Sequence, residues 1–327
     1  MGKSLEECPN SEKMTSKVKI LLLMCVAGVF VFIRVYNIQC CTGQEESLPV
    51  CSCDSCLLEE KDWFSKRFQK SMVPFLSAKY SLPMDAFNWW KRLQIEKRSY
   101  DVFNKTVNRL FQMFPPNPDR FTSNPDQCRT CAVVGNSGNL KGSRYGRLID
   151  FHDVIIRMNS AKVAGFEADV GTRTTHHVMY PESAIDLANN THLVLFPFKI
   201  MDLEWLEKAF TTGFHGRSYM PIRSKVKANK DLVMIINPAF MKYVHEIWLN
   251  KKGGYSSTGF MALIMALHIC DEVHVFGFGA DKDGNWSHYW EPLRNKKLGT
   301  GLHPGTHEYN TVLQLARQLK IKFYLGR

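Results

Sequence analysis

From Cys131 onward, short apolar runs alternate with amphipathic stretches. Short apolar runs between turn residues are typical of buried strands, and apolar residues at a spacing of three and four are typical of helices. The runs predict strands at 131–134, 154–158, 174–179, 193–196, 232–236, 272–276 and 321–325. The helical spacing predicts helices at 202–211, 239–249, 258–269 and 306–319. Strands that alternate with helices predict an α/β fold, with a Rossmann-like, mostly parallel sheet and helices on both faces.

The region before these strands has a helical pattern of its own. Phe103, Val107, Leu110 and Phe114 recur at helical spacing, and a cluster of prolines follows them. Because proline cannot continue a helix, the pattern predicts a helical region over 57–114 that ends there.

An apolar segment near the N-terminus has a different character. Residues 20–33 are all apolar or small, with three lysines just before them and Arg34 after them. A cleaved signal peptide, a buried core helix and a retained signal-anchor all have such a segment. No small-x-small cleavage site follows it, which favours the anchor, and the lysines place the N-terminus in the cytoplasm. The expected organisation is a cytoplasmic tail at 1–17, a transmembrane helix at 18–38, a Cys-rich stem at 39–56 and a lumenal domain at 57–327.

The charge balance indicates an anionic partner. The chain has 42 Lys and Arg against 31 Asp and Glu, a formal net charge of +11. The excess is spread along the chain, whereas nucleic-acid binding usually requires a concentrated patch. The spread of charge therefore argues against a nucleic acid, and a field that attracts a small anionic substrate fits the charge equally well.

Cysteine usage agrees with an oxidising compartment. Of ten cysteines, six lie beyond the membrane edge: Cys51, Cys53, Cys56, Cys128, Cys131 and Cys270. An even number in a lumenal domain indicates disulfides, while two C-x-x-C pairs also have the spacing of zinc ligands. The anchor favours disulfides. Asn104 and Asn189 begin N-x-T triplets and are candidate glycosylation sites, and a third triplet begins at Asn285, close to the candidate functional site.

Candidate chemistry lies in the loops that end the strands. The strand at 131–134 runs into Gly135-Asn136-Ser137-Gly138-Asn139. Gly allows close backbone approach and Asn offers both donors and an acceptor, so the loop fits either a nucleotide site or a tight turn. A second Gly-rich turn, containing Gly277 and Gly279, follows the strand at 272–276.

A third candidate segment opens the apolar helix at 258–269. Tyr255, Ser256, Ser257, Thr258 and Gly259 precede and begin that helix. Ser and Thr are common N-caps, and a helix N-terminus can also bind an anion, so ordinary capping and anion binding both fit.

Two histidine clusters lie in loops near the same predicted sheet edge. His288 belongs to His-Tyr-Trp-Glu291, and His303 precedes the last helix together with His307 and Glu308. Histidine is the commonest base near neutral pH, although a single histidine is more often structural. The spacing of these residues matches no common zinc site. Asp281 and Asp283 form an Asp-x-Asp triplet, which some glycosyltransferases use to bind manganese and which is also common on protein surfaces.

Taken together, these motifs resemble the animal sialyltransferases, whose chains share four sialylmotifs. The large motif resembles 131–180 and the small motif 237–270, while the third resembles His288 to Glu291 and the very small one His303 to Glu308. The stem cysteines, Trp89 to Gln94 and Gly277 to Asp281 narrow the resemblance to the beta-galactoside alpha-2,3-sialyltransferases, types 1 and 2. Asn237 stands where close relatives have His, and the stretch between Glu291 and His303 differs from theirs.

The resemblance implies a variant GT-A-like glycosyltransferase fold, with 57–327 as a catalytic domain, and a Golgi-anchored, single-pass type II enzyme. It implies CMP-sialic acid as donor and galactose-terminated glycoproteins or glycolipids as acceptors, with inversion and without a metal or other cofactor. His303 matches the catalytic base and His288 the residue that contacts the departing phosphate. Residues that match substrate-contacting positions are Asn136, Asn159, Tyr219, Tyr255, Ser257, Thr258, Gly259, Gly279 and Gln94.

The resemblance also implies a disulfide pairing: Cys131–Cys270, with Cys51–Cys56 and Cys53–Cys128 for the remaining four cysteines. Two alternatives stay open at this point, a metal-dependent lumenal glycosyltransferase that uses Asp281 and Asp283, and an inactive galactoside-binding relative. The presence of both His288 and His303 disfavours inactivity.

Overall fold

The structure, a computed structural model, describes Cys53 and residues 62–115, 127–291 and 301–327, all within the compact unit Cys51–Arg327. The expected tail, anchor and most of the stem lie outside the described residues, so the organisation of that part of the chain stays a prediction. Within the described ranges, no helix combines the length and the apolar character needed to cross a bilayer.

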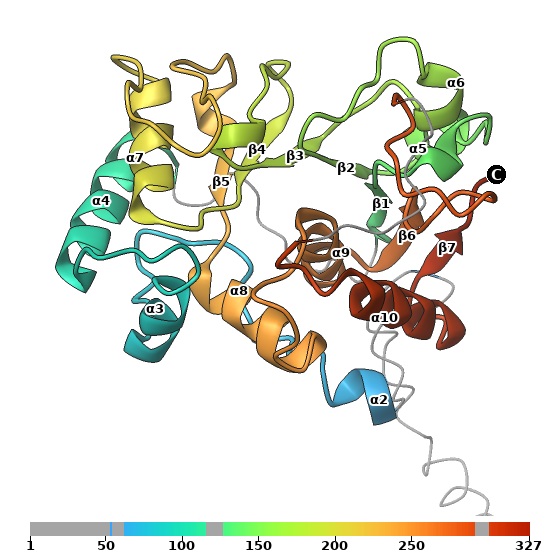
Figure 1. Cartoon of the computed structure of the whole chain (residues 1–327), viewed down its shortest axis with the longest axis horizontal. Helices are drawn as coiled ribbons and strands as arrows, with labels where there is room; N and C mark the ends of the chain where they lie inside the picture. The colour runs from blue at the N-terminus through green and yellow to red at the C-terminus, as the bar shows by residue number, and fades with distance from the viewer. Residues whose placement is uncertain (1–52, 54–61, 116–126, 292–300) are drawn as a thin grey trace, which may run out of the picture. The chain divides into compact units, whose positions relative to one another are not determined.

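A parallel sheet of seven strands forms the centre of this unit, with the order β5-β4-β3-β2-β1-β6-β7 (Figure 1). The strands are β1 (Thr130–Val134), β2 (Val154–Met158), β3 (His176–Met179), β4 (His192–Leu195), β5 (Val233–Ile235), β6 (Glu272–Phe276) and β7 (Lys322–Tyr324). Every neighbouring pair is parallel. The predicted α/β fold is therefore confirmed.

Alternation along β1 divides the core between the two faces of the sheet. Cys131 and Val133 belong to a large apolar cluster on the face that α9 covers, while Ala132 and Val134 belong to a smaller cluster with Leu140 and Ile149. Successive side chains of a strand point to opposite faces, so burial on both sides requires a continuous apolar run.

Helices flank the sheet on both sides. The α-helices are α2 (Asp62–Ser65), α3 (Met84–Trp90), α4 (Tyr100–Met113), α5 (Gly146–Asp150), α6 (Glu167–Val170), α7 (Ile200–Ala209), α8 (Pro238–Tyr243), α9 (Thr258–Ile269) and α10 (Gly305–Arg317). Short 3-10 turns are η1 (Gly138–Leu140), η2 (Pro181–Ser183) and η3 (Lys230–Leu232), and η4 (Val244–Trp248) is π-helical. In Figure 1, α3, α4, α7 and α8 gather beside β5, while α10 lies beside β7.

Two helix predictions were wrong in extent. The described part of the region predicted as helical, 62–114, contains three separate helices, because Pro74 and Pro83 lie in loops between α2 and α4. The helix predicted over 239–249 consists of α8 followed by the π-helical turn η4, although its apolar stripe is buried as expected. Strand and helix boundaries elsewhere differ from the predicted ones by a few residues or less, and the short helices α5 and α6 were not predicted.

Two predicted disulfides are present. Cys131–Cys270 joins β1 to the residue that ends α9, and Cys53–Cys128 joins the stem to the segment before β1. Because these four sulfurs are bonded in two pairs, they are not thiolates that could hold zinc. Cys51 and Cys56 lie outside the described residues, so their pairing stays a prediction.

The three glycosylation triplets differ in exposure. Asn189 is exposed and Asn104 is half-buried on α4, so both stay candidates. Asn285 is only 6% exposed, and its amide nitrogen donates to both carboxylate oxygens of Asp281. A glycan cannot attach to that buried amide without disrupting the loop.

Candidate functional site

One cavity lies at the carboxyl ends of the central strands. It is lined by the loops after β1, β2, β3, β4 and β6, the start of α9 and the segment before α10, and its volume is about 400 Å³. Strand order reverses at β1, since β2 to β5 lie on one side of it and β6 and β7 on the other. In open parallel sheets such a reversal creates the crevice where ligands bind.

The loops after β1 and β6 contact each other through their backbones. A Cβ atom at Gly135 would come within 2.3 Å of the carbonyl oxygen of Gly277, so only glycine allows this approach. Ser137 Oγ donates to the carbonyl oxygen of Gly279 at 2.6 Å, and Asn139 Nδ2 donates to that of Phe278 at 2.8 Å. Both glycine-rich loops named in the sequence therefore form one rigid wall of the cavity.

Two asparagines of the cavity lining are held in place by hydrogen bonds that involve main-chain groups. Asn136 Nδ2 donates to the carbonyl oxygen of Met158 at 3.2 Å, and its buried Oδ1 has no partner among the described residues. Asn159 has a positive φ of 55°, which asparagine tolerates better than most residues. Its carbonyl oxygen lies 2.7 Å from His177 Nε2, so the buried His177 helps to fix the backbone of Asn159.

The start of α9 presents backbone N–H groups to the cavity. Ser257 is the N-cap, with its Oγ accepting from the N–H of Phe260 at 3.1 Å, and Thr258 and Gly259 follow in the cavity lining. Glu308 on α10 fixes the cap, because its carboxylate accepts from Ser257 N at 2.7 Å and from Ser257 Oγ at 2.6 Å. Burial raises the pKa of Glu308.

His303 is positioned as a neutral base. Its Nδ1 lies 3.2 Å from the carbonyl oxygen of Tyr255, and because a carbonyl can only accept, Nδ1 carries the proton and Nε2 the lone pair. The imidazole also meets the Tyr255 ring edge-on, at 4.8 Å between centroids. Burial lowers the pKa of His303, so the ring is neutral at neutral pH.

His288 is oriented by two neighbours in its own motif. Its Nδ1 lies 2.9 Å from Glu291 Oε1, and its ring stacks on Trp290 with centroids 4.7 Å apart. Its backbone forms an isolated bridge with Ser137, which brings the His288 loop to the loop after β1. The hydrogen bond from His288 lowers the pKa of Glu291, so this carboxylate stays ionised and holds the ring.

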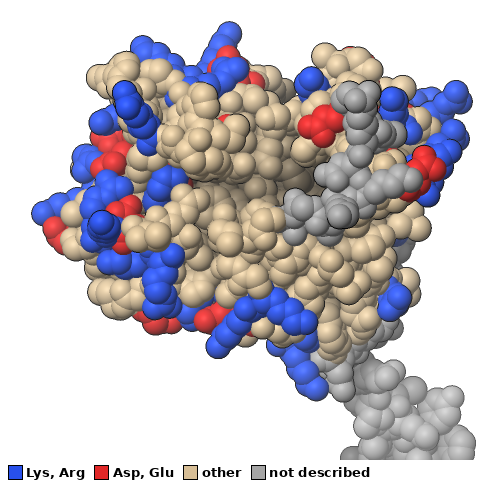
Figure 2. All heavy atoms as spheres, viewed as in Figure 1, with Lys and Arg blue, Asp and Glu red and all other residues tan. Residues whose placement is uncertain are grey.

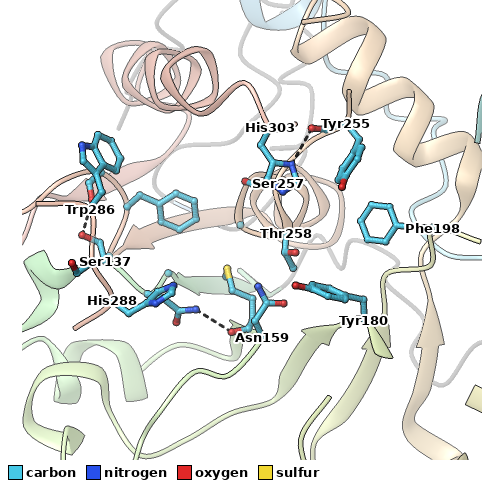
Figure 3. A pocket seen from close by; sticks show the side chains of 18 of the residues that line it. Ser137, Asn159, Tyr180, Phe198, Tyr255, Ser257, Thr258, Trp286, His288 and His303 are labelled. Atoms are coloured by element: carbon cyan, nitrogen blue, oxygen red, sulfur yellow. Dashed lines mark hydrogen bonds between the residues drawn. The ribbon is translucent and has the colours of Figure 1, made fainter. Parts of the chain in front are cut away.

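Aromatic side chains gather at the end of the cavity opposite His288. In Figure 3, Tyr180, Phe198 and Tyr255 lie on one side, and Ser137, Trp286 and His288 on the other. Gln94 and Tyr219 complete the aromatic end, and Gln94 Oε1 accepts from Lys199 Nζ at 2.8 Å. Lys199 therefore fixes the orientation of the Gln94 amide at this end of the cavity. Burial raises the pKa of both Tyr219 and Tyr255, so both hydroxyls stay protonated.

The described lining contains no Lys, Arg, Asp or Glu. Figure 2 likewise shows charged side chains mostly toward the periphery of the face it presents and uncharged atoms over much of its centre. Asp281 and Asp283 are not part of this lining, and the Asp281 carboxylate is occupied by N–H donors of Asp283 and Asn285. The arrangement therefore offers neutral donors to an anion and no carboxylate to a cation.

All eleven catalytic and substrate-contacting residues predicted from the sequence line this one cavity. The residues that sequence reasoning missed as site residues are mostly apolar or aromatic: Met158, Phe198, Phe278 and Trp286, together with Tyr180. Each lies within three residues of a strand end or a histidine motif, and that position was the only signal that could have identified them.

A ligand crevice at the strand reversal, with two loop histidines and a helix N-terminus in one cavity, is typical of an α/β enzyme that acts on an anionic substrate. Comparison with known families gives the assignment. The model of glycosyltransferase family 29, the sialyltransferases, matches residues 75–320. The chain belongs to this family, and it is a sialyltransferase by family and fold.

Named relatives cover most of the chain. It is 47% identical over 285 residues to a chicken CMP-N-acetylneuraminate-beta-galactosamide-alpha-2,3-sialyltransferase 1, spanning 85% of this chain and 82% of the relative. The human type 1 enzyme is 46% identical over 283 residues, with 85% and 83% coverage. The mouse type 2 enzyme is 46% identical over 284 residues, with 84% and 80% coverage.

A solved structure agrees with the fold. The crystal structure of a mammalian sialyltransferase in complex with Gal-beta-1-3GalNAc-ortho-nitrophenol superposes with a TM-score of 0.78, at 47% identity, covering 85% of this chain and all of the other.

Proposed function

We propose that the protein transfers sialic acid from CMP-sialic acid to the 3-hydroxyl of the terminal galactose in Gal-beta-1,3-GalNAc glycans. Relatives at 46–47% identity are named as alpha-2,3-sialyltransferases of beta-galactosamide acceptors, and the solved relative holds a Gal-beta-1-3GalNAc compound. The observation that carries the proposal is that His303, His288 and the N-terminus of α9 line one cavity.

His303 is the general base. The galactose 3-hydroxyl gives its proton to His303 Nε2 as the hydroxyl oxygen attacks the anomeric carbon of sialic acid. The hydrogen bond from Nδ1 to the Tyr255 carbonyl fixes the tautomer that places the lone pair on Nε2. A correctly placed base of this kind contributes about 10²–10⁴-fold to the rate.

Hydrogen-bond donors elsewhere in the cavity stabilise the negative charge that develops on CMP. As the new carbon–oxygen bond forms, the bond from the anomeric carbon to the phosphate oxygen breaks, and the electron pair leaves with CMP. His288, the tyrosine hydroxyls of Tyr219 and Tyr255, and the N–H groups at Thr258 and Gly259 are donors that stabilise this charge. A single displacement of this kind inverts the anomeric carbon.

The donor and acceptor divide the cavity between its two ends. Asn136, Asn159 and the glycine-rich backbone around Gly279 contact the nucleotide, and Gln94 at the aromatic end contacts the acceptor sugar. Neutral donors take the place of a metal in this scheme, since the described part of the lining contains no Asp or Glu.

We place the enzyme in the Golgi membrane as a single-pass type II protein with its catalytic domain in the lumen. The apolar run at 20–33 within the expected helix, the lysines before that run and the two disulfides support this placement. Its partners there are galactose-terminated glycoproteins.

The test is transfer of labelled sialic acid from CMP-sialic acid to Gal-beta-1,3-GalNAc, with EDTA present, followed by linkage analysis of the product. The proposal predicts an alpha-2,3-linked product. Well-folded protein that forms no product, or that transfers only when manganese is added, contradicts it. Galactoside binding without turnover would identify an inactive relative instead.

A further inference from the structure

A second, smaller cavity adjoins the aromatic end of the catalytic cavity. Its volume is about 240 Å³, and its lining consists of Trp89, Arg92, Leu93, Gly254, Tyr255 and Leu302. We call it the side pocket. Tyr255 lines both cavities, Leu93 directly precedes Gln94, and Leu302 directly precedes His303. A ligand that reaches Gln94 and His303 can therefore continue into the side pocket.

The walls of the side pocket are held by backbone packing. The N–H of Gly254 donates to the carbonyl oxygen of Leu302 at 2.8 Å. A Cβ at Gly253 would come within 2.7 Å of Pro304 Cδ, so the loops that carry Tyr255 and His303 lie against each other. Trp89 is buried from the opposite side, with its ring 5.5 Å from that of His245. The side pocket is therefore a preformed feature.

Its chemistry is mostly apolar, with one cation at the rim. Leu302 is 61% exposed, and Ile95, next to Gln94 on the same segment as Leu93, is 79% exposed. Single exposed apolar residues are ordinary. Here, however, Leu302 faces a concave surface that Trp89 and Leu93 share, and the exposed Arg92 lines the same pocket. Such a pocket fits an apolar group with a carbonyl beside it, to which Arg92 can donate.

We propose that the side pocket binds the peptide that carries the acceptor glycan, with an apolar side chain next to the glycosylated Ser or Thr packed against Trp89, Leu93 and Leu302. This inference rests on the proposed function. A volume of about 240 Å³ is below the roughly 300–1,000 Å³ of independent ligand sites, which suits an extension of the sugar site. It accommodates one side chain more readily than the two long alkyl chains of a glycolipid, and Arg92 complements a peptide carbonyl.

The experiment compares acceptors that differ only beyond the sugar. Two short glycopeptides carry Gal-beta-1,3-GalNAc on Thr, one with isoleucine and one with glycine next to that Thr, and a long-chain alkyl glycoside of the same disaccharide is the third acceptor. The measured quantity is the ratio of kcat/KM for the isoleucine peptide to that for the glycine peptide. Burial of one apolar side chain predicts a ratio of about 10 for the wild type.

Two variants remove different walls of the side pocket. Leu302→Ser and Leu93→Ala should both bring the ratio close to 1, and the ratio cancels any loss that affects both peptides equally. Phe151→Ser is the matched control, because Phe151 is 86% exposed, follows α5 and does not line the side pocket. It should keep the wild-type ratio.

A wild-type ratio near 1 would overturn the proposal while leaving the transfer activity intact, and so would a ratio that survives both variants. Another outcome is that the wild type prefers the alkyl glycoside over both peptides and loses this preference in Leu302→Ser. That result would overturn the proposal and show that the side pocket binds a lipid chain instead of a peptide side chain. Absence of transfer to all three acceptors would instead refute the proposed function together with this inference.

Discussion

Glu308 connects the stability of the protein to the structure of the cavity, because it holds the N-cap of α9. Its buried carboxylate accepts from Ser257 N at 2.7 Å and from Ser257 Oγ at 2.6 Å, and Ser257 caps the helix that begins in the cavity lining. Glu308→Leu introduces an apolar side chain of comparable size and leaves the Ser257 N–H without an acceptor. An unsatisfied buried donor costs about 1–3 kcal/mol, and loss of the hydroxyl's partner adds to it.

Removal of a desolvated carboxylate offsets part of this loss, since burial raises the pKa of Glu308 and so disfavours its ionised form. We expect Glu308→Leu to lower the free energy of unfolding by about 2–4 kcal/mol. Glu308→Gln, which keeps one oxygen for the Ser257 N–H, should cost only about 1 kcal/mol. Urea denaturation at pH 7 without reductant measures both values.

The kinetic readout separates the cap from general stability. If Ser257 orients the N–H groups at Thr258 and Gly259, Glu308→Leu should raise KM for CMP-sialic acid more than KM for the acceptor. Equal stability of the Leu and Gln variants would refute the hydrogen-bond reasoning. A destabilised Leu variant with both KM values unchanged would refute the connection between the cap and the donor site.

Three further predictions concern protons and covalent links. Because burial lowers the pKa of His303, the acid limb of kcat/KM should have its midpoint below pH 6.5, and a midpoint above that value would contradict a buried neutral base. Replacing Cys131 and Cys270 together with Ser should lower the free energy of unfolding by about 2–5 kcal/mol in urea titrations, and an unchanged midpoint would show that the bridge contributes nothing. Burial raises the pKa of Asp202 to about 6, so its folded form holds the proton more tightly, and this contribution to stability is lost as pH rises from about 4 through 6. Asp202→Asn should remove up to about 3 kcal/mol of that pH dependence, and an identical pH profile for both proteins would contradict the assignment.

The sequence predicted the sheet well, because both of its faces are buried. Burial on both sides requires continuous apolar runs such as Ala132 to Val134 and Val154 to Ile156, and those runs are visible without a structure. The region before the sheet was predicted less well. Its short helices depend on contacts with distant elements, as when Trp90 Nε1 donates to the Pro197 carbonyl at 2.8 Å, and local spacing carries no record of such contacts.

The candidate site was predicted through its polar motifs. Gly, Asn, Ser and His in loops have few roles, so Asn136, Ser257, His288 and His303 were identifiable from residue type, position and family resemblance. Apolar lining residues such as Phe198 have the composition of a core and become recognisable only once the cavity is formed. Supporting contacts between distant segments, such as that of Glu308 with Ser257, follow from tertiary structure alone.

We propose His303 as the base of a transfer that uses neutral donors. The most direct test measures kcat for sialic acid transfer to Gal-beta-1,3-GalNAc in EDTA, with wild type and His303→Ala side by side and folding checked by denaturation. We expect full wild-type activity in EDTA and a loss of about 10²–10⁴-fold in the variant. Transfer by His303→Ala at the wild-type rate would contradict it.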